Sequence, residues 1–222
     1  MSKKIGLALG GGGARGLAHI GVIKALESAG INIDFIAGTS VGALVGGFYA
    51  ATKDIKFLES EFFNVRGKDI LPIRKILMNQ DGILFRNQSF VESLEKVIKD
   101  VKVESCKVRF RALATDVENG EEVAIDKGNL IEAIKASTAV PLAFKPVSVG
   151  GRLLIDGGFV NPVPADVVRD MGAEYVIAVD VSSRWLNIPK EPIRLRDISE
   201  MINNAFAVVE YQLASTFWKR LI

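Results

Sequence analysis

The residues most able to do chemistry are a serine and the two glycines that flank it. Residues 38–42 read Gly-Thr-Ser-Val-Gly, the G-x-S-x-G pattern of a sharp turn that joins a strand to a helix and exposes the serine hydroxyl. The apolar segment 33–37 precedes this turn, and a segment rich in small residues follows it. We therefore predict Ser40 as a nucleophile, with Gly38 and Gly42 shaping its turn. The alternative is a serine that only caps an ordinary helix.

A serine nucleophile needs a base, and two residues are candidates. Asp156 ends an apolar stretch, and Gly157 and Gly158 follow it, so the backbone can come close to the serine turn. A carboxylate with an ordinary pKa of about 3.9 is a weak base, so Asp156 must either be partly desolvated or act in concert with ionisation of the serine. The chain has one histidine, His19, which shares a helical face with apolar residues and is predicted to be a packed structural residue. A plain turn aspartate and a catalytic histidine are the alternatives.

A glycine-rich loop follows the first apolar segment. Residues 11–16 fit G-x-G-x-x-G, but a dinucleotide site also needs an acidic residue at the end of the second strand, and Asp34 lies at its beginning.

The N–H groups of such a loop can instead stabilise an oxyanion. We predict this role for Gly11, Gly12, Gly13 and Arg15. The Arg15 side chain either fixes the loop or contacts an anionic head group of the substrate. The alternative to both functional roles is an ordinary surface arginine at the start of a helix.

Composition excludes several classes of protein. The 222 residues are 49% hydrophobic with a formal net charge of +2, which fits a globular domain and argues against nucleic acid as the main partner. The single cysteine cannot form an internal disulfide, no His/Cys spacing fits a zinc site, and a reducing compartment is expected. No signal-peptide core or membrane-spanning run is present in the sequence. We expect a cytoplasmic protein without a metal or other cofactor.

The order of the elements predicts an α/β fold with a parallel sheet and helices on its faces. A strand at 5–9, a helix at 14–29 and a strand at 33–37 form a βαβ unit, whose strands are parallel. The antiparallel strands 107–115 and 122–125 flank Asn119-Gly120, a tight-turn dipeptide. Further predicted elements are a helix capped by Asn129 that ends at 137, strands at 147–149 and 153–155, a helix at 164–172, a strand at 175–181 whose apolar sequence indicates a central position, and a helix from Asp197. Residues 1–222 are predicted to be one domain, with 54–100 as a helical side layer or cap.

Four motifs in this order resemble the patatin-like phospholipases of the bacterial type. They are the 11–16 loop, the 38–42 turn, the segment Ala-Ser-Thr-Ala-Val-Pro at 136–141, and Asp-Gly-Gly at 156–158. The resemblance covers nearly all of the chain and implies a three-layer αβα fold with a mainly parallel central sheet. It also implies a Ser40–Asp156 dyad that hydrolyses carboxylic esters of lipids through an acyl-enzyme, without metal. One departure is Lys145-Pro146, where many relatives have two prolines.

The resemblance also implies the partner, which is a lipid or other acyl-ester substrate such as a phospholipid or lysophospholipid. Residues 67–79 mix basic and apolar side chains, which fits either peripheral contact with a membrane or a partly buried helix with solvated lysines. The sequence predicts no oligomeric state. The alternative function is a catalytically silent lipid-binding or scaffold protein on the same fold, against which the intact Ser40 and Asp156 argue.

Overall fold

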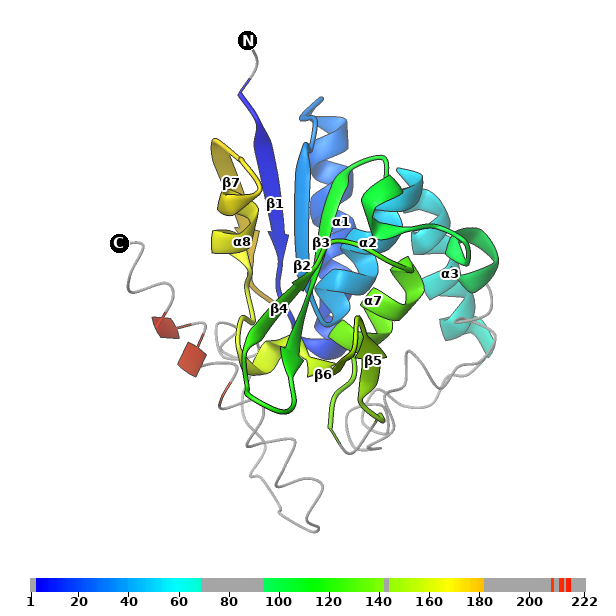
Figure 1. The fold of residues 1–222 in the computed structure, drawn as a ribbon. Coiled ribbons are helices and arrows are strands. Elements are labelled where there is room, and N and C mark those ends of the chain that lie inside the picture. Colours follow the sequence, from blue (N-terminus) through cyan, green and yellow to red (C-terminus); the bar gives the residue numbers. More distant parts are fainter. Residues whose placement is uncertain are drawn as a thin grey trace, which may run out of the picture.

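The computed structural model describes residues 3–68, 94–141 and 144–181, together with 209, 212–213 and 215–216. They form a central sheet with helices on both faces, which confirms the predicted three-layer αβα fold (Figure 1). The strands are β1 (Ile5–Leu9), β2 (Phe35–Thr39), β3 (Arg109–Asp116), β4 (Glu122–Ile125), β5 (Val147–Val149), β6 (Arg152–Asp156) and β7 (Tyr175–Val179).

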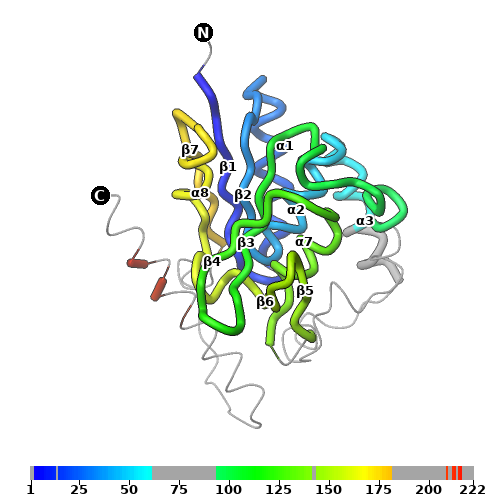
Figure 2. The backbone as a smooth tube through the Cα atoms, viewed as in Figure 1, coloured from blue at the N-terminus to red at the C-terminus, as the bar shows by residue number. Residues whose placement is uncertain are grey.

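The sheet has a parallel part and an antiparallel part. Its order is β5-β6-β3-β2-β1-β7, with β4 paired to β3 off this path. The pairs β1–β2, β1–β7 and β2–β3 are parallel, whereas β3–β4, β3–β6 and β5–β6 are antiparallel. The tube in Figure 2 shows the antiparallel hairpin of β3 and β4 crossing the front of the molecule. Because β1 and β2 run in the same direction, the loops that follow them meet at one end of the sheet.

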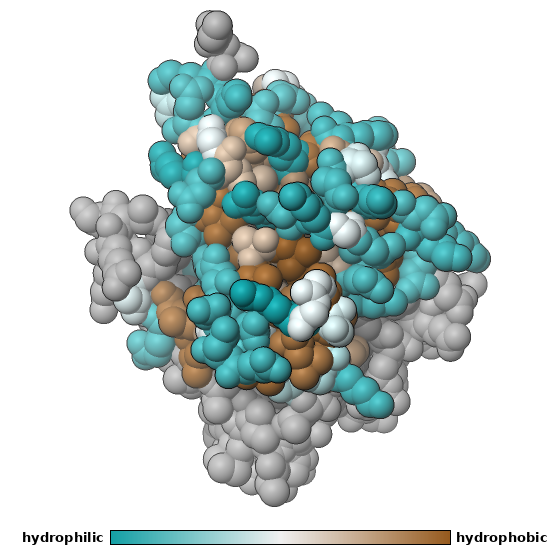
Figure 3. Space-filling view, viewed as in Figure 1, coloured by the Kyte–Doolittle hydropathy of each residue, from teal (hydrophilic) through white to brown (hydrophobic). Residues whose placement is uncertain are grey.

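The helices divide between the two faces of the sheet. The described helices are α1 (Ala18–Ser28), α2 (Val41–Thr52), α3 (Ile55–Lys68), α7 (Leu130–Ser137) and α8 (Ala165–Asp170), with short 3-10 turns η1 (Gly13–Leu17), η2 (Val103–Ser105) and η3 (Gly157–Phe159). The hydrophobic core follows this division: one buried cluster lies between the sheet and α1, α2 and α7, and a smaller one lies between the sheet and α8. The face seen in Figure 3 carries hydrophilic side chains over most of its described surface, with hydrophobic ones visible between them.

Local signals account for several of these elements. The Asn129 side chain accepts a hydrogen bond from the N–H of Glu132, which confirms the predicted cap of α7. The helix predicted from residue 14 begins instead as the 3-10 turn η1, and its α-helical part starts at Ala18. Gly16 in this turn packs so closely on α2 that a Cβ there would lie 2.2 Å from a Val41 methyl carbon.

One prediction about the sheet is wrong. The apolar run at 175–181 indicated a central strand, but within the described residues β7 pairs only with β1 and ends the sheet. Its residues 176–179 are half-buried and pack alternately against the two hydrophobic clusters, so an apolar sequence also suits this edge strand. The predicted amphipathic segment 67–79, most of the predicted cap and the helix from Asp197 lie largely outside the described residues.

Candidate active site

The predicted turn at residues 38–42 joins β2 to α2. Ser40 has φ 55° and ψ −123°, a backbone conformation that residues with a side chain rarely adopt and that clusters at functional sites. A Cβ at Gly42 would lie 2.0 Å from the carbonyl oxygen of Leu9, and a Cβ at Gly38 would lie 2.4 Å from that of Gly42. The turn therefore excludes any side chain at either glycine, and α2 begins against the end of β1.

Ser137, the last residue of α7, holds the backbone of Ser40 and had no predicted role of its own. Its fully buried Oγ accepts a hydrogen bond of 3.0 Å from the Ser40 N–H. Ser40 lies just beyond Thr39, the last residue of β2 that pairs with β3, so its N–H needs an acceptor outside the sheet. Sequence spacing gives no signal for this contact, because the two serines are 97 residues apart.

Strand register brings Asp156 beside Ser40. β3 lies between β2 and β6 in the sheet. Thr39 pairs with Leu113 of β3, and Asp156 pairs with the next residue, Ala114. The end of β2, which precedes Ser40, and the end of β6, which carries Asp156, therefore pair with neighbouring residues of β3.

Hydrogen bonds on three sides fix Asp156 itself. The Thr115 hydroxyl donates to the Asp156 carbonyl oxygen over 2.8 Å, and the Asp156 N–H donates to the Ala139 carbonyl over 3.1 Å. The carboxylate Oδ1 accepts from the Gly158 N–H at 2.8 Å. A Cβ at Gly157 would lie 2.3 Å from a carbonyl oxygen of β3, so this glycine allows the close approach and Gly158 supplies the donor.

The environment of Asp156 favours a proton acceptor that works near neutral pH. Complete burial raises the pKa of the Asp156 carboxyl to about 7, although the Gly158 N–H and the Ser40 hydroxyl both act to lower it. Within the described residues Oδ2 has no hydrogen bond of standard geometry, so the Ser40 hydroxyl meets the carboxyl in a looser contact. Groups with a pKa near the working pH are effective general bases, and the burial of Asp156 supplies the shift.

The glycine-rich loop leaves β1 next to the serine turn, but its three predicted glycine donors differ. The Gly11 N–H is already engaged, because it donates to the Pro162 carbonyl over 2.9 Å. Over the described ranges, the N–H groups of Gly12 and Gly13 donate to no protein acceptor. Adjacent unengaged amides suit an oxyanion, so Gly12 and Gly13 are the candidates for that contact and Gly11 anchors the loop.

Arg15 anchors the other side of the loop. Its Nε donates to the carbonyl oxygen of Val181, just beyond β7, over 2.8 Å. A Cβ at Gly12 would lie 2.8 Å from the same oxygen, so the loop packs directly on this residue. This hydrogen bond supports one of the roles predicted for Arg15, that of fixing the loop.

His19 lies beneath the loop. It is fully buried, and its Nε2 lies 2.8 Å from the Gly10 carbonyl oxygen, so Nε2 carries the proton. Burial lowers the pKa of His19 from 6.5, although the Gly10 contact and the charge of Asp180 oppose the shift. The contact with Gly10 agrees with the predicted structural role.

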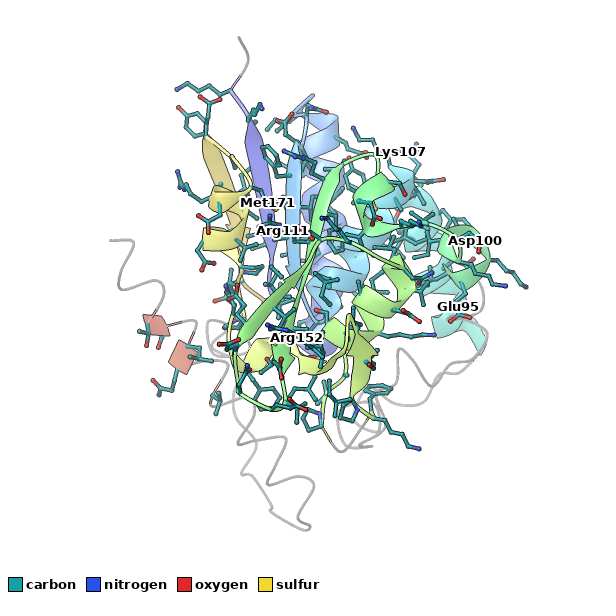
Figure 4. All side chains as sticks on the ribbon, viewed as in Figure 1. Glu95, Asp100, Lys107, Arg111, Arg152 and Met171 are labelled. Carbon is teal, nitrogen blue, oxygen red and sulfur yellow. The ribbon has the colours of Figure 1, made fainter. Side chains whose placement is uncertain are left out.

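Charged groups near this end of the sheet pair with one another. Arg152, labelled in Figure 4, lies 3.6 Å from an Asp116 oxygen and 3.7 Å from a Glu121 oxygen. Among the described residues, no three His, Cys, Asp or Glu side chains gather as metal ligands do. No described helix has the length and apolar character needed to cross a bilayer.

The sequence pattern of the patatin-like phospholipases matches residues 7–169, more than half of the chain. The chain therefore belongs to the patatin-like phospholipase family, which confirms the resemblance seen in its motifs.

Individual relatives support the same assignment. The chain is 38% identical over 201 residues to the Mycobacterium tuberculosis "Uncharacterized NTE family protein Rv1063c", which covers 84% of this chain and 55% of that protein. It is 39% identical over 186 residues to the Caenorhabditis elegans "Patatin-like phospholipase domain-containing protein ZK370.4", covering 81% and 14%, and 35% identical over 185 residues to human "Patatin-like phospholipase domain-containing protein 6", covering 81% and 13%. The chain thus spans about half of the mycobacterial relative and a small part of the animal ones.

The crystal structure of VipD from Legionella pneumophila aligns with a TM-score of 0.43 at 14% identity, over 72% of this chain and 46% of VipD.

Proposed function

We propose that this chain is a serine lipid acyl hydrolase that cleaves carboxylic ester bonds of phospholipids, lysophospholipids or related acyl esters. The observation that carries the proposal is the placement of Ser40, in a positive-φ turn, against a buried carboxyl whose pKa is raised to about 7. Family membership supports a lipid ester as the substrate class.

In the first half of the reaction, the Ser40 oxygen attacks the ester carbonyl carbon while its proton passes to Asp156. A tetrahedral intermediate forms and then collapses. The bond between the carbonyl carbon and the alcohol oxygen breaks, and the leaving alcohol takes the proton from Asp156. The acyl group remains on Ser40 as an ester.

In the second half, Asp156 accepts a proton from water, and the water oxygen attacks the acyl-enzyme. Collapse of this second intermediate releases the fatty acid and returns the proton to Ser40. A base that serves both halves must be free of strong ion pairs, and within the described residues no cation pairs with the Asp156 carboxyl.

The negative charge on the carbonyl oxygen is the largest electrostatic change in both halves. The unengaged N–H groups of Gly12 and Gly13 are proposed to bind this oxyanion. A preorganised donor of this kind contributes about 3 kcal/mol to lowering a barrier. Arg15, through Val181, and Gly11, through Pro162, keep the loop in place.

The proposal places the protein in the cytoplasm, in peripheral contact with a membrane, because phospholipid substrates reside in bilayers. The basic and apolar segment at 67–79 is the candidate for this contact. We further propose that residues 1–222 act as one unit, with 54–100 as a side layer to the site.

The alternative is a catalytically silent lipid-binding protein on the same fold. Hydrolysis of a short-chain p-nitrophenyl ester and of phospholipid vesicles, with and without EDTA, separates the two functions. The parent should be active in both conditions and Ser40→Ala inactive, while Ser60→Ala, which removes an exposed serine of α3, serves as the matched control. Ser40→Ala activity within tenfold of the parent would exclude Ser40 as the nucleophile.

A further inference from the structure

Two consecutive residues after η3 contact all three parts of the proposed site. The Asn161 carbonyl accepts a hydrogen bond of 2.7 Å from the hydroxyl of Thr39, the neighbour of the nucleophile. The Asn161 N–H donates over 2.9 Å to the carbonyl of Gly157, the neighbour of the base. The next carbonyl, that of Pro162, accepts from the Gly11 N–H of the glycine loop. A displacement of this short segment would therefore move the nucleophile, the base and the oxyanion loop together.

The side chain of Asn161 fixes the segment in place. It is only 7% exposed, and its Nδ2 donates two hydrogen bonds of 2.9 Å, one to Glu122 Oε2 and one to Asp166 Oδ1. Glu122 begins β4 and Asp166 lies in the first turn of α8. Figures 1 and 2 show the chain that leads from η3 to α8 passing beside β4. Asn161 thus bridges the sheet and the helix on its second face.

The two acceptors, Glu122 and Asp166, are both carboxylates, and they share the Asn161 amide as a common donor. Within the described residues no cation pairs with either one. Partial burial and the charges of Asp166 and Asp170 raise the pKa of Glu122, while the Asn161 amide opposes the shift. Both amide hydrogens are used, one for each carboxylate, so any residue without two donors leaves like charges facing each other.

We propose that Asn161 is the positioning residue that holds Ser40, Asp156 and the oxyanion loop in place relative to one another, through the hydrogen bonds that its side-chain amide donates to Glu122 and Asp166. The inference rests on the proposed hydrolase function. Asn161 touches no reacting atom in the proposed reaction. Its effect falls on turnover, because a misplacement of about 1 Å in a catalytic group can slow a reaction by about a hundredfold.

The test replaces the amide with a group of nearly the same size. Asn161→Asp keeps the backbone contacts but loses both donors and adds a third carboxylate. We expect kcat to fall at least about tenfold with KM within about twofold, measured per folded molecule on a short-chain ester, and labelling of Ser40 by a fluorophosphonate probe to slow in parallel. Asn32→Asp, at an exposed position far from these contacts, is the matched control.

Two further variants separate positioning from a loss of folding. Adding Glu122→Gln to Asn161→Asp restores one donor and acceptor pair and returns the number of carboxylates to that of the parent, so kcat should recover at least about threefold. Glu122→Ala removes one acceptor at the start of β4 and should lower kcat about threefold without a change in KM, even where Asn161→Asp fails to fold.

Each outcome decides between the claims. An active parent together with unchanged kcat in Asn161→Asp and Glu122→Ala, or a double variant without recovery, would overturn the role of Asn161. A lower melting temperature with parental turnover per folded molecule would reduce Asn161 to a purely structural residue and overturn the proposal equally. A parent that neither hydrolyses esters nor reacts with the probe at Ser40 would instead refute the hydrolase function on which the inference rests.

Discussion

The Ser137 Oγ and the Ser40 N–H form a hydrogen bond of 3.0 Å that joins the end of α7 to the proposed nucleophile. The bond gives an acceptor to the Ser40 N–H, which lies beyond the last residue of β2 that pairs with β3. It also supports the positive φ of Ser40, a conformation that costs on the order of 1 to 3 kcal/mol when the surroundings do not enforce it. The orientation of the nucleophile therefore depends on a helix that carries no proposed catalytic residue.

Removal of that acceptor should impair turnover as well as stability. In Ser137→Ala the Ser40 N–H loses its partner, at a cost of about 1 to 3 kcal/mol. We expect the free energy of unfolding to fall by that amount and kcat/KM to fall about tenfold or more, as measured by denaturant titration and ester hydrolysis. Ser148→Ala, at an exposed position in β5, is the control. Parental turnover in folded Ser137→Ala would show that the bond does not position Ser40.

The pH dependence of kcat/KM should report the ionisation of Asp156. A general base must be deprotonated, and the pKa of Asp156 is raised to about 7. The rate should therefore rise tenfold per pH unit below about pH 7 and become level above it. Because the pKa of His19 is lowered from 6.5, His19 does not cause the rise in rate centred near pH 7. His19→Gln should therefore leave the midpoint of the pH profile unchanged. A profile that is level down to pH 5 would contradict a raised pKa.

The same shift predicts that the proposed base destabilises the fold at neutral pH. The folded pKa of about 7 lies above the ordinary value of 3.8, so the folded state holds this proton more tightly than the unfolded state does. The stabilisation is present below about pH 4, is lost as the pH rises to about 7, and amounts to about 4 kcal/mol. Asp156→Asn cannot ionise, so it should be the more stable protein at pH 8 and inactive. Thermal unfolding at pH 5 and pH 8 tests this, and a parent more stable than Asp156→Asn at pH 8 would refute it.

Two glycine positions should respond in opposite directions to alanine. Gly42→Ala places a Cβ 2.0 Å from the Leu9 carbonyl oxygen and should lower the free energy of unfolding by about 3 kcal/mol or more. Gly21 lies exposed in α1, and among the described residues a Cβ there would meet no packing neighbour within 4 Å, so Gly21→Ala should raise stability by about 0.5 to 1 kcal/mol. Equal effects of the two substitutions on the melting temperature would contradict the close packing of the serine turn on β1.

The features that the sequence predicts well are those encoded by neighbouring residues. The serine turn depends on glycines two residues from Ser40, and the cap of α7 on Asn129 and a residue three positions later. The order of strands and helices indicated the layered fold because a βαβ unit has one favoured arrangement.

The contacts that the sequence does not reveal join segments that lie far apart in the chain. Ser137 and Asn161 meet the serine turn across 97 and 122 residues, and such contacts exist only after the sheet has assembled. The central position expected for β7 failed for a related reason. β7 lies at the edge of the described sheet, but its residues 176–179 pack half-buried against the hydrophobic clusters on both faces, so its apolar sequence resembles that of a central strand.

The most direct test of the Ser40–Asp156 dyad is the rate of fluorophosphonate labelling, followed by intact mass and peptide mapping. The dyad predicts a single adduct on Ser40 in the parent, labelling slowed by about a hundredfold or more in folded Asp156→Asn, and near-parental labelling per folded molecule in His19→Gln. An adduct on another residue, or parental labelling in Asp156→Asn combined with its loss in folded His19→Gln, would contradict the dyad.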